Sequence, residues 1–325
     1  MLPVAIDAMG GDHAPGAIVE GAQRAAAELG VPVVLVGRPE ELGTEHGLAV
    51  LPASEVIAMA ADPGASVRRM KDSSLVRAAE AVRDGKAAAM VSAGNTGATM
   101  ASALLRMGRI RGVARPAIAT PIPVPGSTPT VLLDAGANAE CQAAWLLQFA
   151  QMGAVFARER YGIATPRVGL LSIGEEPSKG NDLVKDAHVL LAAEGALAAS
   201  GATFVGNVEG RDIMTDGVDV VVADGFTGNV VLKTLEGGMR TLVRAVFDAL
   251  GPSEVAEPAI AALMPLYGVL DPDATGGAML LGVDGVCIIS HGSSSATAIV
   301  NATRVAAEMV EAGLVDRLRA AVSVA

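Results

Sequence analysis

The sequence predicts an α/β protein of three layers, in which helices cover both faces of one mostly parallel β-sheet. Short, apolar, β-rich segments alternate with Ala-rich segments of helical periodicity along most of the chain. The segment Val220–Ala223 is apolar throughout, as expected for a strand that is buried on both faces. The 325 residues suffice for one large domain or two closely joined lobes.

The strands are predicted where Val, Ile and Leu cluster between Gly, Asp, Asn or Ser. In chain order, the predicted strands are Val4–Ala8, Val33–Gly37, Ala87–Ser92, Ala117–Ile122, Thr130–Asp134, Arg167–Ser172, Val218–Asp224 and Val286–Ser290. The helices are predicted where apolar residues recur at helical spacing. They are Pro15–Leu29, Ser73–Asp84, Thr96–Met107, Gln142–Tyr161, Asp182–Glu194, Asn229–Leu250 and Ala296–Ala312. The Pro-rich segment Pro121–Pro129 is the candidate crossover between two lobes.

Composition excludes several classes of protein. The chain is 51% hydrophobic and carries a net charge of −11, with only 2% aromatic residues, so it folds around a large core and has no face suited to nucleic acid. Its two cysteines form neither a disulfide framework nor a zinc cluster, which fits a reduced, cytoplasmic protein. We find no signal peptide and no apolar segment long enough to span a bilayer.

Six of the predicted strands end in loops of the same chemical kind. These loops are rich in Gly, Asn, Ser and Thr, and each leads into a helix. They contain Gly10–His13, Gly94–Gly97, Gly136–Asn138, Gly174–Asn181, Gly225–Asn229 and Gly292–Ser295. Since ligands bind at the carboxyl ends of parallel strands, and helix N-termini attract anions, we expect the six loops to form one anion-binding pocket.

Common catalytic motifs are absent from the sequence. It has no dinucleotide fingerprint, P-loop, nucleophile elbow or zinc-protease motif. Cys287 lies within an apolar strand, and Cys141 lies at the start of a helix, which could lower its pKa, but no Cys–His pairing is apparent. We therefore expect a bound substrate to be the nucleophile.

Taken together, the loop sequences resemble the phosphate acyltransferase (PlsX) family of bacterial phospholipid synthesis. The resemblance runs in order from about residue 3 to residue 312, and it is sharpest at Ser92–Gly97 and Gly206–Gly210. It also covers Asp7–Pro15, Ile173–Asn181, Asp224–Asn229 and Ser290–Ser294. One position departs from the family pattern, because Gln142 replaces a lysine after Gly136–Asn138.

The resemblance implies a fold similar to the isocitrate/isopropylmalate dehydrogenase–phosphotransacetylase group, with residues 1–325 as a single catalytic domain. It implies that phosphate attacks the thioester of acyl carrier protein and forms an acyl phosphate, without a cofactor or metal. A membrane acyltransferase acting on glycerol 3-phosphate would use this product. Family members are homodimers that attach peripherally to the membrane.

For this reaction we expect Lys185 and Asn229 to act closest to the phosphate, with His13 orienting the phosphate or protonating the leaving sulfur. Further substrate-binding residues are expected in the loops: Gly10, Gly11, Asp12, Gly94, Asn95, Thr96, Asn138, Lys179, Gly180, Asn181, Thr227, Gly228, His291 and Ser293. For each loop, helix capping is the competing structural interpretation.

Acyl carrier protein is acidic, so a basic face should bind it. The candidates are two clusters, one of Arg68, Arg69 and Lys71 and one of Arg106, Arg109, Arg111 and Arg115. An apolar segment near 253–272 is expected to be either a tip that enters the membrane interface or a helix in a dimer core. Two rival functions stay open: a short-chain phosphate acyltransferase that uses acyl-CoA, and a metal- and NAD-dependent dehydrogenase of related fold.

Overall fold

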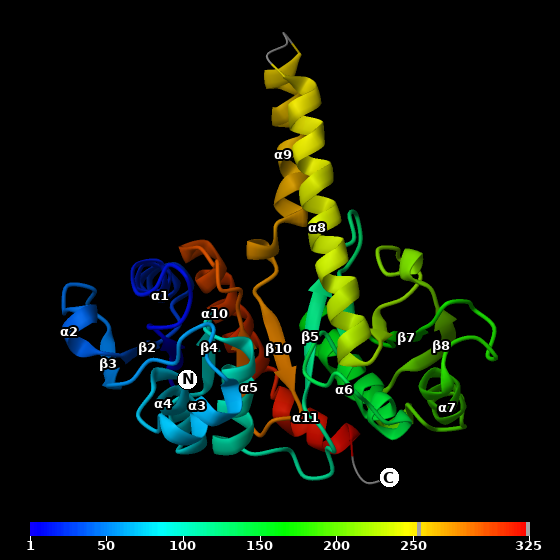
Figure 1. The fold of residues 1–325 in the computed structure, drawn as a ribbon, viewed down its shortest axis with the longest axis horizontal. Coiled ribbons are helices and arrows are strands. Elements are labelled where there is room, and N and C mark those ends of the chain that lie inside the picture. The colour runs from blue at the N-terminus through cyan, green and yellow to red at the C-terminus, as the bar shows by residue number, and fades with distance from the viewer. Residues whose placement is uncertain (252–254, 323–325) are drawn as a thin grey trace.

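The computed structural model describes residues 1–251 and 255–322, and its centre is one continuous sheet of 11 strands (Figure 1). The strand order is β3-β2-β1-β4-β11-β10-β5-β6-β9-β7-β8. The strands are β1 Val4–Asp7, β2 Val33–Gly37, β3 Ala49–Pro52, β4 Ala89–Ser92, β5 Ala117–Ile122, β6 Thr130–Leu133, β7 Arg167–Leu171, β8 Thr203–Val208, β9 Val220–Val222, β10 Ala278–Leu281 and β11 Val286–Ile289.

Helices cover both faces of this sheet, which confirms the predicted three-layer α/β/α class. One apolar core packs α1, α6, α10 and α11 against the sheet, and a second core packs α3, α4 and α5 against it. The helices are α1 Gly16–Leu29, α2 Pro39–Leu42, α3 Pro63–Arg69, α4 Ser74–Arg83, α5 Thr96–Arg106, α6 Ala143–Tyr161, α7 Asp182–Leu191, α8 Gly225–Leu250, α9 Ala256–Leu270, α10 Ala296–Glu311 and α11 Leu314–Ala321.

The strand directions correct the expectation of one common loop end. In the middle of the sheet, β5 pairs antiparallel with both β10 and β6, and β10 pairs antiparallel with β11. Consequently β1, β4 and β11 run opposite to β6, β7 and β9. The six glycine-rich loops therefore fall into two groups of three at opposite ends of the sheet, and the strand-end rule alone does not bring them together.

Several elements differ from those predicted. The strands β3, β8 and β10 and the helices α2, α3 and α11 were not predicted, and α9 falls in the apolar segment for which a helix was one of two expectations. Pro121 lies within β5, and the Pro-rich segment connects the antiparallel strands β5 and β6 of the one sheet. Helix α8 begins at Gly225, capped by Asp224, so Asn229 lies one turn inside the helix instead of in a turn before it.

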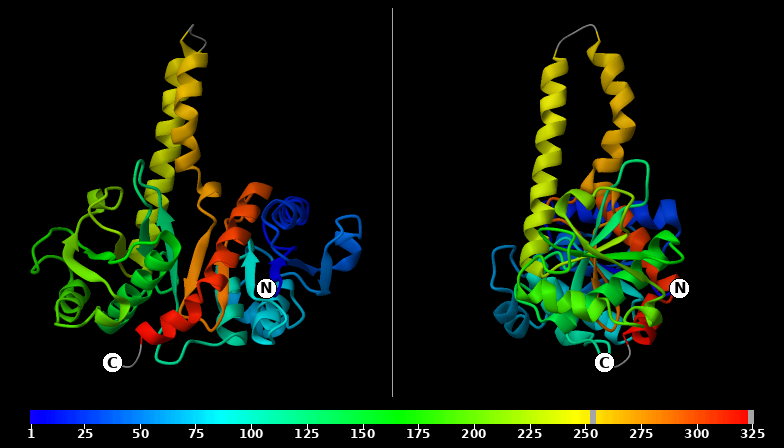
Figure 2. Two further views of the ribbon diagram at one scale, coloured as in Figure 1. Left: turned by 180° about the vertical axis from the view of Figure 1, so that it is seen from behind. Right: turned by 90° about the vertical axis from the view of Figure 1, so that its right-hand side faces the viewer.

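Helices α8 and α9 stand out from the body of the protein as a hairpin (Figures 1 and 2). Residues 258–270 of α9 carry no charged side chain. Of the apolar segment expected near 253–272, residues 253 and 254 lie outside the described residues. Within the described part of the chain, no helix combines the length and apolar character that crossing a membrane requires.

Candidate functional site

A buried carboxylate organises the loops at one end of the sheet. Asp7, at the end of β1, is 1% exposed and accepts hydrogen bonds from Ser92 Oγ at 2.7 Å and from the Met9 backbone N–H at 3.2 Å. Burial raises its pKa, and the hydrogen bonds oppose that rise. A side chain at Gly10 would collide with the Asp7 carboxylate and the Gly94 backbone, so the loops after β1 and β4 need glycine to pack this closely.

A second buried carboxylate, Asp134, organises the loops at the opposite end of the sheet. Asp134 is fully buried and accepts backbone hydrogen bonds from Ile118, Gly136, Ala137 and Asn138 at 2.8 to 3.1 Å. Burial is again the largest influence on the carboxylate, and it raises the pKa of Asp134. These bonds hold the loop after β6 in the shape against which the start of α8 packs.

Helix α8 carries residues from the second loop group toward the first. Gly228 packs so tightly on the Asp134 carbonyl that a Cβ there would overlap the oxygen. This contact fixes where the helix begins and how it crosses the sheet face. As a result, Asn229, Lys233 and Glu236, spaced four and three residues apart on one helix face, lie over the middle of the sheet.

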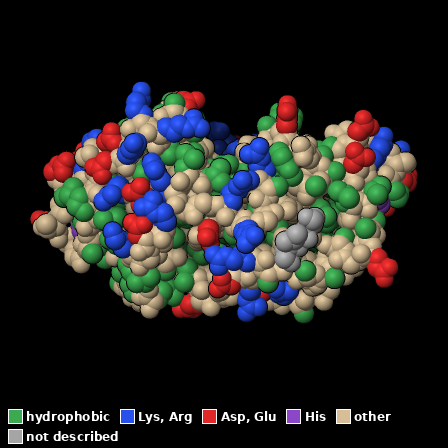
Figure 3. Space-filling model, turned by 90° about the horizontal axis from the view of Figure 1, so that it is seen from below, with side chains coloured by type: hydrophobic (Ala, Val, Ile, Leu, Met, Phe, Trp, Pro, Cys, Tyr) green, Lys and Arg blue, Asp and Glu red, His purple; other side chains and the backbone are tan. Residues whose placement is uncertain are grey.

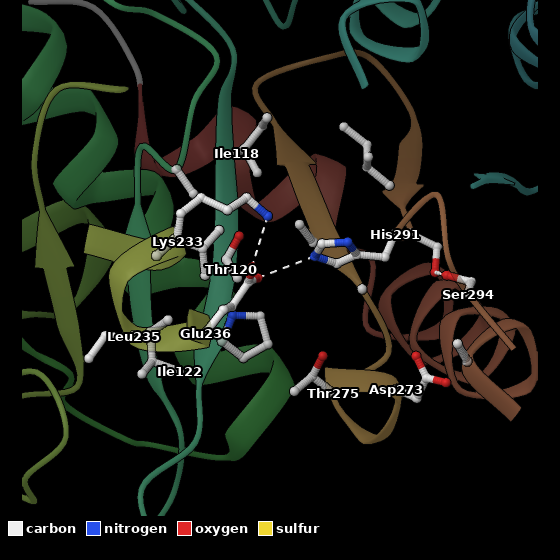
Figure 4. Close-up of a pocket in the computed structure, with 18 of the residues that line it drawn as sticks. Ile118, Thr120, Ile122, Lys233, Leu235, Glu236, Asp273, Thr275, His291 and Ser294 are labelled. Carbon is white, nitrogen blue, oxygen red and sulfur yellow. Dashed lines mark hydrogen bonds and ion pairs between the residues drawn. The ribbon is translucent and has the colours of Figure 1, made fainter. Parts of the chain in front are cut away.

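A cavity of about 280 Å³ lies beneath α8, and we call it the central cavity. Both loop groups contribute to its lining: Thr96, His291 and Ser294 come from the first, and Ala135 and Asn229 come from the second. Its walls combine donors and apolar side chains (Figure 4), including Ile118, Thr120, Ile122, Leu232, Lys233, Leu235, Glu236, Met239, Leu270, Asp273, Thr275 and Ser290.

Three ionisable side chains meet in the central cavity. Lys233 Nζ donates to Glu236 Oε2 at 2.9 Å, and His291 Nε2 lies 3.2 Å from Glu236 Oε1 (Figure 4). Burial alone would raise the pKa of Glu236, but the hydrogen bonds from His291 and Lys233 and their charges outweigh it and lower the pKa to about 2. Glu236 is therefore ionised and holds a lysine and a histidine side by side.

The rest of the cavity also suits an anion. The first turns of α5 and α10 border it through Thr96 and Ala298, and helix N-termini offer N–H groups and a partial positive charge. Thr120 Oγ1 is buried and has no hydrogen-bond partner among the described residues, which is unusual for a buried hydroxyl without a ligand. Asp273 is the exception, because its carboxylate would repel an anion; it accepts a hydrogen bond from Ser295 Oγ at 2.5 Å.

Of the residues predicted from sequence, the central cavity brings together Thr96, Asn229 and His291. Asp12 lies beside this group, since its backbone N–H donates to the Gly292 carbonyl at 2.7 Å. Neighbouring His13 and Ser293 are exposed and do not line the cavity. Gly11, with a φ of +112°, packs against Ala93 and Gly292 and so joins the loops after β1, β4 and β11.

Four predicted ligands have their polar groups engaged by the protein itself. Asn95 caps α5 and donates to the carbonyls of Met59 and Ala61. Asn138 donates to the Pro116 carbonyl and to Asp134, while Thr227 hydrogen-bonds to Asp224. Asn181 caps α7 by accepting from the Val184 N–H. Each makes the capping or loop contact that competed with a ligand role.

The loop after β7 lies in the half of the sheet formed by β6, β9, β7 and β8, away from β1, β4 and β11. Lys179 and Lys185 are exposed there, and neither lines the central cavity. Gly180 has a φ of +95° and packs on Val184 and on Ser172, whose buried Oγ has no hydrogen-bond partner among the described residues. Their roles in catalysis stay predictions.

The two cysteines do not provide a thiolate. Burial raises the pKa of Cys141 to about 11 and that of Cys287 to about 12. The expectation that a helix start could lower the pKa of Cys141 is therefore wrong, because the helix begins at Ala143 and burial dominates. Within residues 1–251 and 255–322, no three His, Cys, Asp or Glu side chains are grouped to hold a metal ion.

The sequence analysis missed Lys233, Glu236 and Thr120. Lys233 and Glu236 lie in a long helical segment, where charged residues usually face solvent. Their spacing was the available signal, since Asn229, Lys233 and Glu236 recur at positions that share one helix face. Thr120 gave no signal, because a single threonine in an apolar strand is ordinary.

The predicted basic clusters differ in how far their charges are engaged. Arg68, Arg69 and Lys71 are exposed at the end of α3, and Arg109, Arg111 and Arg115 are exposed after α5. Arg106 lies 3.8 Å from Glu80, and the Arg115 guanidinium lies over the Trp145 ring at 4.9 Å. Seen from below, Lys and Arg side chains spread over the left part and the middle of the view, with some acidic residues among them (Figure 3).

Comparison with known proteins gives consistent matches. Residues 2–317 match the model of a family described as "Fatty acid synthesis protein". The chain is 48% identical to the phosphate acyltransferase of Pelotomaculum thermopropionicum, covering 99% of this chain and 95% of that protein. It is 49% identical to the phosphate acyltransferase of Heliobacterium modesticaldum, and the match covers 98% of this chain and 97% of that protein.

Solved structures with similar folds include EutD phosphotransacetylase from Staphylococcus aureus, with a TM-score of 0.62 and 16% identity over 95% of this chain and 94% of that one. A branched-chain phosphotransacylase from Enterococcus faecalis gives a TM-score of 0.63 and 16% identity over 95% and 99%. At this level of identity the likeness shows the fold alone, and it confirms the predicted fold group.

Proposed function

Since the chain belongs to the phosphate acyltransferase family, and is an enzyme that transfers an acyl group to phosphate, we propose that its donor is the fatty acyl thioester of acyl carrier protein. We further propose that the reaction takes place in the central cavity. The observation that carries this proposal is the cluster of Lys233, Glu236 and His291 beside Asn229 and two helix N-termini.

In the proposed reaction, phosphate binds among Lys233, Asn229 and His291. One ionised phosphate oxygen attacks the thioester carbonyl carbon, and a new C–O bond forms. The tetrahedral oxyanion then collapses, the C–S bond breaks, and the sulfur leaves with the electron pair and takes a proton from His291 or water. The enzyme contributes positioning and charge stabilisation, which are the main needs of a reaction whose nucleophile is already ionised.

Glu236 has a positioning role in this proposal. As a carboxylate it would repel phosphate if it were bare, but it accepts a hydrogen bond from Lys233 and contacts His291. It thereby fixes the direction of both side chains and partly offsets their charge. Lys233 keeps two further N–H donors for the phosphate, and the side-chain amide of Asn229 offers another.

We also propose, from the sequence, that Lys185 and His13 assist and that the basic clusters bind the carrier protein. The exposure of Arg109 and Arg111 supports the docking role. Reversing both charges to Glu should raise KM for acyl carrier protein without changing KM for phosphate. Unchanged KM for the carrier protein would exclude this segment.

A homodimer and peripheral attachment to the membrane are further proposals, supported by the apolar side chains that the α8–α9 hairpin exposes. Leu242 is 65% exposed and Val269 is 47% exposed. An enzyme placed at the membrane could pass its acyl phosphate to a membrane acyltransferase for phospholipid synthesis. Sedimentation with anionic and with neutral lipid vesicles tests the attachment, and no binding to either would contradict it.

The direct test of the proposed function is a reaction with oxygen-18-labelled phosphate and acyl-carrier-protein thioester, followed by mass spectrometry. We expect an acyl phosphate that keeps all the labelled oxygens, together with free carrier protein. A covalent acyl-enzyme, or no acyl phosphate, would contradict direct attack. If short-chain acyl-CoA reacts faster than acyl carrier protein, the alternative of a short-chain acyl-CoA enzyme is correct instead.

A further inference from the structure

A second cavity, of about 480 Å³, lies between the outer turns of α8 and α9, and we call it the outer crevice. On α8, Met239, Val243 and Phe247 are spaced four residues apart and form one row on the helix. On α9, Met264, Tyr267 and Leu270 are spaced three apart and form the facing wall. The rings of Phe247 and Tyr267 lie 6.4 Å apart, so the two walls meet.

The outer crevice is continuous with the central cavity. Glu236, Met239 and Leu270 line both of them. Glu236 marks the end that meets the central cavity, and beyond Met239 the apolar side chains of Val243, Phe247 and Tyr267 share the lining with charged residues. The charged residues of the crevice include Arg240, Arg244 and Asp248, which are exposed and can keep their charged ends in water while their stems border it.

We propose that the outer crevice binds the fatty acyl chain of the substrate, with the thioester in the central cavity and the methyl end toward the tip of the hairpin. This assignment rests on the proposed function. An acyl chain attached to a carbonyl in the central cavity must leave it in some direction, and burial of its methylenes is favourable only along an apolar path. The row Met239–Val243–Phe247 provides such a path, about 12 Å long at 1.5 Å per helical residue.

Blocking the crevice from the α8 side tests the proposal. In Val243→Trp, the larger ring should fill the crevice and shorten the chain that fits. We expect the ratio of kcat/KM for hexadecanoyl over butanoyl carrier-protein thioester to fall roughly tenfold or more. Thr241→Trp is the matched control, because Thr241 lies two residues from Val243 on α8, is exposed and does not line the crevice. Its ratio should stay at the wild-type value.

A second pair of variants blocks the opposite wall, so that a folding defect in one variant does not decide the result. Met264→Trp should lower the same ratio. Leu266 is 42% exposed and lies outside the crevice, so Leu266→Trp should leave the ratio unchanged. Unchanged ratios in both blocking variants, or equal changes in the controls, would overturn the proposal. The proposal would also be overturned if the blocking variants lost kcat/KM equally for both donors and light scattering showed that their dimer had dissociated. A second copy of the chain would then be what fills the crevice.

The wild-type protein separates this proposal from the proposed function. If wild-type enzyme forms acyl phosphate from both donors but the blocking variants keep its preference between them, only the crevice assignment fails. If wild-type enzyme forms no acyl phosphate from either donor, the proposed function itself fails.

Discussion

The inner and outer turns of α8 belong to one helix, yet they meet opposite surroundings. The inner turns, up to Glu236, pack on the sheet, and their Gly228 touches the Asp134 carbonyl. The outer turns extend beyond the body beside α9, and a Cβ added at Gly237 or Gly238 would meet nothing within 4 Å. The inner turns therefore place charged groups accurately, whereas the outer turns provide an apolar surface that tolerates change.

This difference matches the two parts of the proposed substrate. A phosphate and a thioester carbonyl need donors held at fixed positions, because electrostatic stabilisation depends on pre-set geometry. A fatty acyl chain needs only apolar contact, which is not directional. A single helix that crosses from the sheet face into a free-standing hairpin can provide both.

The largest effect is expected at the inner turns. Lys233→Ala removes the cation that faces the central cavity, and we expect kcat to fall roughly 10²–10³-fold, as for loss of one transition-state donor. Steady-state kinetics with circular dichroism as a folding check would measure this. The control is Thr241→Ala on the exposed outer turns of α8, outside both cavities, for which we expect less than about a threefold change. Equal losses in the two variants would remove the distinction between the regions.

Stability should separate the same regions. Gly228→Ala places a methyl group against the Asp134 carbonyl, so we expect it to destabilise the fold by about 3 kcal/mol. Gly237→Ala, in an open part of the same helix, should instead stabilise the protein by up to about 1 kcal/mol, because alanine favours helix. Urea unfolding measures both. A tolerated Gly228→Ala would mean that α8 does not depend on this contact.

Acid sensitivity should depend on Glu236. The folded-state pKa of about 2 lies below the ordinary value of 4.5, so the carboxylate stabilises the fold above that ordinary value and loses the contribution as pH falls toward the folded pKa. We expect Glu236→Gln to lower the free energy of unfolding by up to about 2–3 kcal/mol near neutral pH, and by progressively less in acid. Urea unfolding of both proteins at about pH 6 and about pH 3 measures this. A difference that does not change with pH would show that Glu236 is not held by Lys233 and His291.

The smallest effect is expected outside the cavity. Lys185 is predicted from sequence to act on the phosphate, but it is exposed on α7 and does not line the central cavity. We expect Lys185→Ala to lower kcat about tenfold, less than Lys233→Ala, through loss of a more distant positive charge. An unchanged rate would remove Lys185 from the mechanism, and a loss greater than that of Lys233→Ala would move the centre of the site toward the loop after β7.

Much of the fold was predictable because buried parallel strands are continuous apolar runs. The strand directions were not, since they depend on how strands pair, and an apolar run such as Ala117–Ile122 or Thr130–Leu133 does not show whether its neighbour is parallel or antiparallel. Because β10 pairs antiparallel with both β11 and β5, β5 runs in the same direction as β11. The antiparallel pairing of β5 with β6 then reverses the second half of the sheet and separates loops that the sequence placed together.

The site was predictable in part for a related reason. His291, Thr96 and Asn229 stand at or near strand ends, where binding residues are expected, whereas Lys233 and Glu236 reach the cavity only because α8 crosses the sheet face. That crossing depends on the packing of Gly228 on Asp134, a contact between residues far apart in the sequence. No local pattern reports it.

The most direct test of the central claim is a crystal of the protein soaked with tungstate, a heavy analogue of phosphate, and examined by anomalous scattering. We predict a peak within hydrogen-bond distance of Lys233, Asn229 and His291 in the central cavity, and none in Lys233→Ala. A peak at the Lys179–Asn181 turn with the central cavity empty would contradict the account.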